Sequence, residues 1–289
     1  MKLRTLFTFL LTLLAVAGLT LMSTTASPAG AASRWASASS AAIHPGVMMY
    51  TKSAQCSANF VFTDAAGHVY VGYAAHCAAK GSSSDTDGCT TASYPRGTAV
   101  TFNDGGNVFD EGTVVGRGTL AYSSWITMKK KHVTNANTCA YNDLALVKVR
   151  PADVHKVNPS VPFWGGPTGI DRNGTKAGDE VYTYGNSSLR AGLSPLSPHT
   201  GVSFGDASAD GGWSHSLYTV TPGIPGDSGS GFMTAGGKAI GVLSTLDITP
   251  LPGSNSIGDL SKELAWAQAN SGIKGLRLVK GTEPFHGLL

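Results

Sequence analysis

Short runs of apolar and β-branched residues, separated by turn residues, recur along most of the chain. Residues 60–62 and 68–71 flank the segment 64–67 (Asp-Ala-Ala-Gly), which has the composition of a hairpin turn. Residues 144–149 are apolar at every position except Lys148, which is typical of a buried strand. Further strands are predicted at 98–102, 113–115, 179–184, 216–220, 231–233 and 239–243. The pattern therefore predicts a β-rich body.

One helix is predicted, close to the C-terminus. Leu260, Leu264, Ala267 and Ala269 lie near helical spacing, and Asp259 or Ser261 is suited to cap the N-terminal end. The sequence Asn-Ser-Gly at 270–272 ends the helix. The chain has 37 glycines and only 13% charged residues, which favours short strands and tight turns over long helices.

The N-terminal segment has the pattern of an export signal. Lys2 and Arg4 precede an apolar run over 6–22, and small residues follow, with a suitable cleavage site at 29–31 (Ala-Gly-Ala). The apolar run is also long enough for an uncleaved membrane anchor, which is the alternative. We predict a signal peptide at 1–31, an extracellular location and no membrane contact after its removal.

The remainder divides by composition into two strand-rich halves. We predict the following segments: an Ala/Ser-rich leader or short pro-segment at 32–45, a first half at 46–150, a Pro/Gly-rich linker at 151–169, a second half at 170–258, and the helix with a tail at 259–289. The formal net charge of +3 is too small to indicate nucleic acid as a partner.

The cysteines predict disulfides rather than a metal site. An even number in an exported chain indicates two disulfides, with three possible pairings; the four are Cys56, Cys77, Cys89 and Cys139. No Cys-x-x-Cys pair is present, so we expect no structural zinc. The acidic loop residues Asp85, Asp87 and Asp104 are interpreted as solvated, and no metal or cofactor is expected.

Ser228 is the first candidate for chemistry. It lies at 226–231 in the sequence Gly-Asp-Ser-Gly-Ser-Gly. A serine hydroxyl becomes an effective nucleophile only beside a base and near donors that stabilise an oxyanion. Glycines around it would allow a substrate carbonyl close to the backbone N–H groups of Gly226 and Ser228. A plain flexible Gly/Ser turn is the alternative.

His76 and Asp143 are the candidate partners of this serine. His76 ends a strand-like run and directly precedes Cys77, so a disulfide would restrain its backbone. Asp143 opens the apolar run 144–149, and a carboxylate there needs hydrogen bonds, for which a histidine N–H is one donor. A strand-capping role is the alternative for Asp143. No catalytic role is assigned to the other histidines, which are His44, His68, His132, His155, His199, His215 and His286.

Together these three motifs resemble those of the trypsin/chymotrypsin-like serine proteases, in the order His, Asp, Ser, and more closely the secreted members from actinobacteria. The resemblance covers about 45–270. It implies two six-stranded antiparallel β-barrels followed by a C-terminal helix. It also implies a monomeric endopeptidase acting on protein or peptide substrates.

The resemblance assigns a role to each residue. Ser228 attacks the scissile carbonyl, His76 exchanges its proton and Asp143 orients His76. The N–H groups of Gly226 and Ser228 form the oxyanion hole. Ser244, Thr245 and Leu246 resemble the edge strand that pairs with the substrate backbone. The family's disulfide next to the histidine implies Cys56–Cys77, and Cys89–Cys139 follows.

Several positions depart from the family pattern. Ser230-Gly231 replaces the usual Gly-Pro, and no Ile-Val-Gly-Gly terminus exists; 43–47 (Ile-His-Pro-Gly-Val) is the nearest sequence. We therefore hypothesise that Asp227 pairs with a group other than a new N-terminus. Pro222 occupies the position where an acidic residue selects Lys or Arg, and Leu246 replaces a common glycine. Both predict poor cleavage after Lys or Arg and a preference for small or apolar residues.

Two other classes of function remain as alternatives. The first is a secreted protease-fold protein that binds without cleaving. The second is a non-proteolytic serine esterase of the α/β-hydrolase kind, because 226–230 also match Gly-x-Ser-x-Gly. That fold requires its histidine after the serine, where only His286 is found, together with alternating strands and helices.

Overall fold

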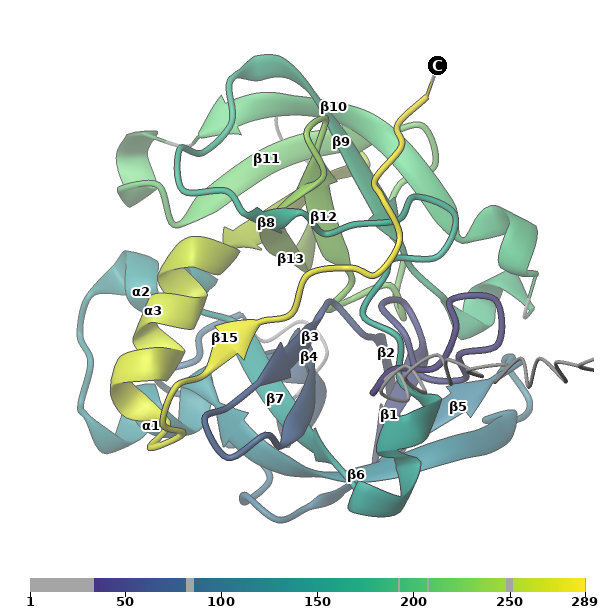
Figure 1. Ribbon diagram of the computed structural model, residues 1–289. Coiled ribbons are helices and arrows are strands. Elements are labelled where there is room, and N and C mark those ends of the chain that lie inside the picture. Colours follow the sequence, from purple (N-terminus) through teal and green to yellow (C-terminus); the bar gives the residue numbers. More distant parts are fainter. Residues whose placement is uncertain (1–33, 82–85, 192, 207, 248–251, 289) are drawn as a thin grey trace, which may run out of the picture. The chain divides into compact units, whose positions relative to one another are not determined.

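The computed structural model describes residues 34–81, 86–191, 193–206, 208–247 and 252–288. Figure 1 shows two β-sheets and a C-terminal helix in this part of the chain. The predicted signal peptide and Asp85 lie outside the described residues. Among the described residues, no helix is both long and apolar enough to span a bilayer.

The first sheet is built mainly from the N-terminal half. Its strands are β1 (Met48–Thr51), β2 (Ala54–Ser57), β3 (Val61–Thr63), β4 (Val69–Ala74), β5 (Ala99–Asp104), β6 (Thr113–Ser123), β7 (Leu144–Val149) and β15 (Arg277–Leu278). They lie in the order β15-β3-β4-β7-β6-β5-β1-β2, with antiparallel neighbours. Between β2 and β3, Ala58 bonds to Val47, and Asn59 and Phe60 bond to Gly72. The sheet therefore curls round from β2 to β3.

The second sheet closes on itself. Its strands are β8 (Gly169–Ile170), β9 (Ala177–Tyr184), β10 (Pro198–Asp206), β11 (Ser214–Thr219), β12 (Gly231–Thr234), β13 (Lys238–Asp247) and β14 (Ser254–Asp259). Since β12 pairs with both β9 and β13, the order β12-β9-β10-β11-β14-β13 forms a closed antiparallel barrel. The short β8 adds to β13 in parallel. The predicted all-β fold of two antiparallel barrels with a C-terminal helix is confirmed, and the α/β-hydrolase fold is excluded.

Apolar side chains form a buried core against each sheet. Leu144–Val149 is buried except for the half-buried Lys148, as its composition predicts. Phe60, Phe62 and Tyr73 belong to the core of the first sheet and are fully buried. A smaller cluster fills the second sheet; it consists of Val181, Leu217, Phe232, Ile240, Leu243 and Ile257.

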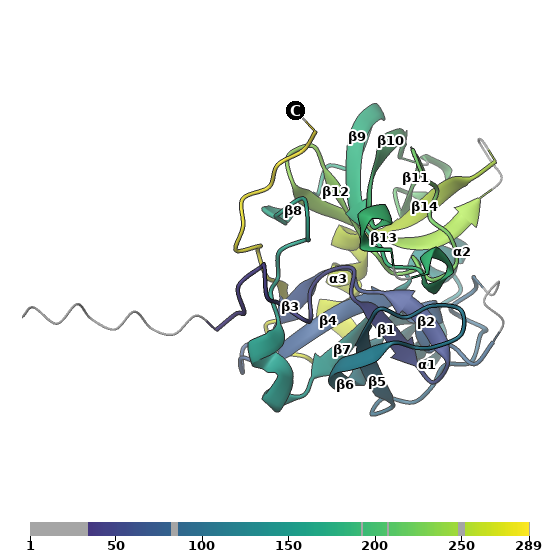
Figure 2. The same cartoon turned by 90° about the vertical axis from the view of Figure 1, so that its right-hand side faces the viewer.

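The helices are short. They are α1 (Ser124–Lys130), α2 (Ala136–Tyr141), α3 (Leu260–Asn270) and the 3-10 turns η1 (Ala75–Ala78), η2 (Pro151–Lys156), η3 (Ser188–Arg190), η4 (Ser194–Leu196) and η5 (Ser208–Asp210). Of the two predicted caps for α3, Asp259 is the one used, since its carboxylate accepts the Lys262 N–H. α3 packs against α1, β7 and β13 and so touches both sheets (Figures 1 and 2).

Several contacts join segments that the sequence predicts to be separate. The predicted boundaries of the leader, the two halves, the linker and the tail stay predictions. Ile43, in the predicted leader, is fully buried and bridges Val157. The predicted linker contains η2 and the start of β8. In the C-terminal tail, β15 returns to pair with β3 of the first sheet.

Candidate active site

Three contacts fix the backbone around His76. The residue lies in η1, at the end of β4, where the Ala75 N–H donates to the Asp143 carbonyl at 2.8 Å. The His76 N–H donates to Asp143 Oδ1, also at 2.8 Å. On the other side, Cys77 forms a disulfide with Cys56 of β2. The imidazole therefore starts from a backbone that is held on both sides.

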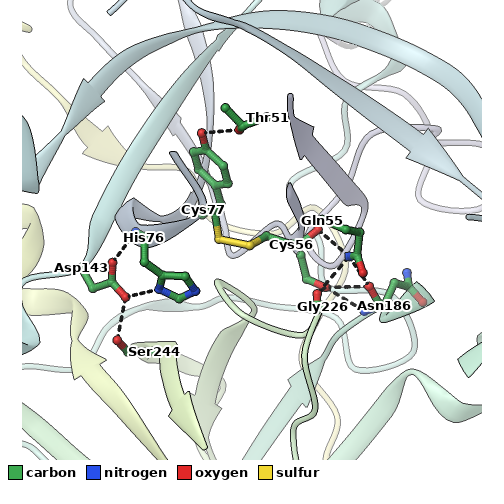
Figure 3. The surroundings of a disulfide bond; sticks show 11 residues. Thr51, Gln55, Cys56, His76, Cys77, Asp143, Asn186, Gly226 and Ser244 are labelled. Carbon is green, nitrogen blue, oxygen red and sulfur yellow. Dashed lines mark hydrogen bonds and ion pairs between the residues drawn. A yellow bond between two sulfur atoms is a disulfide. The ribbon is translucent and has the colours of Figure 1, made fainter. Parts of the chain in front are cut away.

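Asp143 meets the imidazole from the start of β7. Its Oδ2 lies 2.7 Å from His76 Nδ1 and accepts the Ser244 hydroxyl at 2.6 Å. The side chain is almost completely buried. Ser244 lies at a register shift in the pairing of β13 with β14, between Leu243 and Thr245. Figure 3 shows Asp143 between His76 and Ser244.

Burial and charge act on His76 in opposite directions. Burial alone lowers the pKa of the imidazole, but the charge of Asp143 and its hydrogen bond outweigh burial and raise the pKa above the ordinary 6.5. The bond at Nδ1 leaves Nε2 as the nitrogen available for proton exchange when the ring is neutral. His76 can thus act as a base with a defined orientation.

The loop that carries Ser228 is held by both sheets. The Ser228 carbonyl accepts the Ser57 N–H at 2.9 Å, and the Gly229 N–H donates to the Leu243 carbonyl at 2.7 Å. Gly226 and Gly229 have φ of +99° and +89°. A Cβ on Gly226 would lie 2.2 Å from Gln55 Oε1, and one on Gly229 would lie 2.7 Å from the Ala74 nitrogen. Glycine is therefore required at both positions by the backbone conformation and by close packing. These two requirements explain the glycines more directly than the expected room for a substrate carbonyl.

The peptide groups of this loop are oriented by side chains. Ser187 Oγ donates to the Pro225 carbonyl at 2.5 Å. Gln55 and Ser57, from β2, donate to the Gly226 carbonyl at 3.0 and 2.9 Å. Within the described part of the chain, the N–H groups of Gly226 and Ser228 have no acceptor. Since C=O and N–H of a trans peptide point in opposite directions, Ser187 turns the Gly226 N–H away from itself.

His76, Asp143 and Ser228 line one cavity of about 590 Å³. The predicted substrate residues Ser244, Thr245 and Leu246 also line it, whereas Pro222 does not. The walls also include residues 54–56, residues 223–226 and Asn255. The structure therefore brings together the residues of the three sequence motifs, which come from both sheets.

Known proteins of similar structure include several serine proteases. Protease A of Thermobifida fusca matches with 18% identity over 83% of this chain and 99% of that chain, at a TM-score of 0.49. A Nocardiopsis protease matches at 18% identity over 82% and 98%, with a TM-score of 0.44. A glutamic acid-specific serine protease matches at 16% identity over 82% and 100%, with a TM-score of 0.45.

The fold is chymotrypsin-like. No family profile and no curated protein sequence matches the chain. At identities and TM-scores this low, the structural matches do not assign an activity to it.

In this chymotrypsin-like fold, one disulfide lies at the site and the other away from it. Cys56–Cys77 lies between the His76–Asp143 pair and the Gln55–Gly226 contacts (Figure 3). Cys89–Cys139 ties the segment after η1 to α2. These are the pairs that the family resemblance implies.

Asp227 has a partner that the sequence did not identify. The carboxylate is 2% exposed and forms a two-pronged ion pair with Arg190 of η3, with both N–O distances at 2.5 Å. The Ile224 N–H donates to the same carboxylate. An arginine fork matches a carboxylate in this geometry.

Other residues missed by sequence reasoning are neutral side chains that bind backbone. Asn255 accepts the Gly223 N–H at 2.9 Å and donates to the Thr245 carbonyl at 3.2 Å, so it joins two walls of the cavity. No local pattern distinguishes Gln55, Ser187 or Asn255 from ordinary polar strand and loop residues. Their signal lies in contacts between segments far apart in the sequence.

The remaining candidates have other contacts. Asp87 accepts the Cys89 N–H in a turn, and Asp104 is exposed. Among the described residues, both clusters of metal-ligating types contain two cysteines already joined as a disulfide, so neither offers a metal site. His215 is buried between Asp206 and Asp259 and lies apart from the cavity-lining residues.

Proposed function

We propose that this chain is a secreted serine endopeptidase that uses His76, Asp143 and Ser228. The observation that carries the proposal is the pair of bonds from Asp143 to the N–H and Nδ1 of His76, in the cavity that Ser228 also lines. Two disulfides support an oxidising, extracellular location. Substrates are proteins or peptides, and the protein acts as a monomer.

The proposed reaction assigns one step to each of these groups. Ser228 Oγ attacks the scissile carbonyl while His76 Nε2 takes its proton, and the N–H groups of Gly226 and Ser228 stabilise the oxyanion. Collapse expels the amine, which receives the proton from His76, and leaves an acyl group on Ser228. Water, activated by His76, then releases the acid product. Asp143 stabilises the imidazolium at each stage.

The substrate backbone pairs with the edge of β13 at Ser244–Leu246, in the manner of an added strand. Leu246 and Asn255 face each other across the β13–β14 ladder, and both line the cavity. The bulky side chain of Leu246 and the Asn255 amide, which is held by its bonds to Gly223 and Thr245, support a narrow pocket. We therefore expect chromogenic peptides with Ala, Val or Leu before the bond to be cleaved faster than those with Lys or Arg. Fastest cleavage after Arg would contradict this specificity.

Activation does not use a newly cleaved terminus. Asp227 is already paired with Arg190, and the Ile43 N–H donates to the Lys156 carbonyl. N-terminal sequencing of the active protein tests this. An active form that begins at Ile43, with its amine paired to Asp227, would contradict the proposal.

Casein hydrolysis by the wild type and Ser228→Ala tests the activity. We expect the rate of casein hydrolysis by the variant to be at least about 10³-fold lower than that of the wild type, with an unchanged melting temperature. Ser53→Ala, at an exposed serine between β1 and β2 that does not line the cavity, is the matched control and keeps full activity. A stable wild type without casein hydrolysis would favour the binding protein, or an esterase if it cleaves simple esters.

A further inference from the structure

Glu263 is a fully buried carboxyl group directly behind the His76–Asp143 pair. It lies in the first turn of α3 and is 0% exposed. Its Oε1 accepts the Asp143 N–H at 2.9 Å. Its Oε2 has no hydrogen-bond partner among the described residues. A buried ionisable group is costly, so its position needs a reason.

The bond from Glu263 completes the restraint of Asp143. The Asp143 carbonyl accepts from Ala75, Oδ1 accepts from the His76 N–H, and Oδ2 meets His76 Nδ1 and Ser244. The N–H is the remaining polar group, and it precedes the first pair of the β7 ladder with β4. Glu263 supplies the acceptor that the sheet does not.

The neighbouring strand leaves room for this carboxyl group. Gly258 of β14 is directly beside it: a Cβ there would lie 2.6 Å from Glu263 Oε1 and 2.7 Å from the Tyr141 carbonyl. The Glu263 carboxyl group thus lies between α3, Gly258 of β14 and the end of α2. There is room for it because Gly258 has no side chain.

The surroundings favour the neutral acid. Burial raises the pKa of Glu263 well above the ordinary 4.5; the Asp143 N–H opposes this, and the charges of Asp143 and Asp259 add to it. With Glu263 neutral, Asp143 is the anion that faces His76.

We infer that Glu263 is a positioning residue. Its side-chain Oε1 accepts the Asp143 N–H, which fixes the backbone of Asp143 and so aligns the Asp143 carboxylate with His76. This inference rests on the proposed function for its kinetic consequences. The geometry itself concerns only the Asp143–His76 pair, so it is also testable without catalysis.

The test compares Glu263→Gln with Glu263→Leu. Glutamine keeps a neutral acceptor, so we expect kcat within about 2-fold of wild type and an unchanged His76 pKa, measured by NMR titration. Leucine removes the acceptor. We expect kcat to fall about 10-fold with KM nearly unchanged, and the His76 pKa to fall toward 6.5. Leu264→Ala, a buried change one residue along α3, controls for loss of stability and leaves both readouts unchanged.

A second pair keeps the test open if Glu263→Leu does not fold. Gly258→Ala pushes on Oε1 and should lower kcat and the His76 pKa, whereas Gly169→Ala, with no atom within 4 Å of the new Cβ, should not. Wild-type kcat and His76 pKa in a folded Glu263→Leu, or in Gly258→Ala if Glu263→Leu does not fold, would overturn the inference. So would equal losses in the Gln and Leu variants. A wild type without hydrolysis would overturn the proposed function instead, while the titration still tests the positioning.

Discussion

The charge on Asp143 sets the pH range over which His76 can act as a base. The raised pKa of His76 means that the imidazole is protonated, and inactive as a base, until the pH passes above about 6.5. We expect kcat/KM of the wild type to rise through that raised pKa and then hold at higher pH. Asp143→Asn should shift the rise to lower pH and reduce kcat on the order of 10⁴-fold. A pH–rate profile measures both, and a maximum near pH 4 would contradict the assignment.

Arg190 is expected to be essential because it neutralises a buried charge. Arg190→Ala leaves the Asp227 carboxylate buried without its partner, which costs about 3–5 kcal/mol. Arg190→Lys keeps the charge but not the fork, so it should recover only part of the stability and activity. Urea unfolding with casein assays checks this. A fully active Arg190→Ala would show that Asp227 does not depend on the arginine.

At the scale of the element, the two disulfides are expected to differ in their effect on activity. Removing either by a double Cys→Ala change should cost about 2–4 kcal/mol of stability. Cys56–Cys77 adjoins His76 and the Gln55 contacts, so its loss should also lower kcat. Cys89–Cys139 closes a longer loop away from the cavity, so its loss should mainly lower the melting temperature. Equal kcat in both double variants would contradict this difference.

The sequence predicts several apolar strands and α3, but it misses the buried strand β1 and the short helices α1 and α2. It predicts the polar strands poorly. Leu144–Val149 was predicted with its observed bounds because its neighbours on both faces are apolar. Strands β10 and β14 were missed, since Pro, Gly, Ser, Asn and Asp dominate them and their stability comes from pairing within the closed barrel. The motif residues were predicted as candidates from local patterns. Arg190 and Glu263 were not, because each meets its partner across a long separation in sequence.

Across the whole molecule, stability should depend on pH through a buried histidine. Burial alone would lower the pKa of His215, but hydrogen bonds and charges from Asp259 and Asp206 raise it above 6.5. A raised folded-state pKa gives stability that is fully present below the unfolded pKa and is lost as pH rises through the folded one. Thermal unfolding should therefore show the melting temperature of the wild type above that of His215→Gln. This difference should be largest at roughly pH 5–6.5 and smaller at higher pH. A difference that grows with pH would contradict this.

The central claim is that Ser228, activated by His76, is a nucleophile. The most direct measurement is treatment of the purified protein with a fluorophosphonate, followed by digestion and mass spectrometry of the labelled peptide. The proposal predicts one label, on Ser228, formed slowly below the raised His76 pKa and absent in His76→Ala. A folded protein that takes no label, or takes it on another serine, would contradict the account.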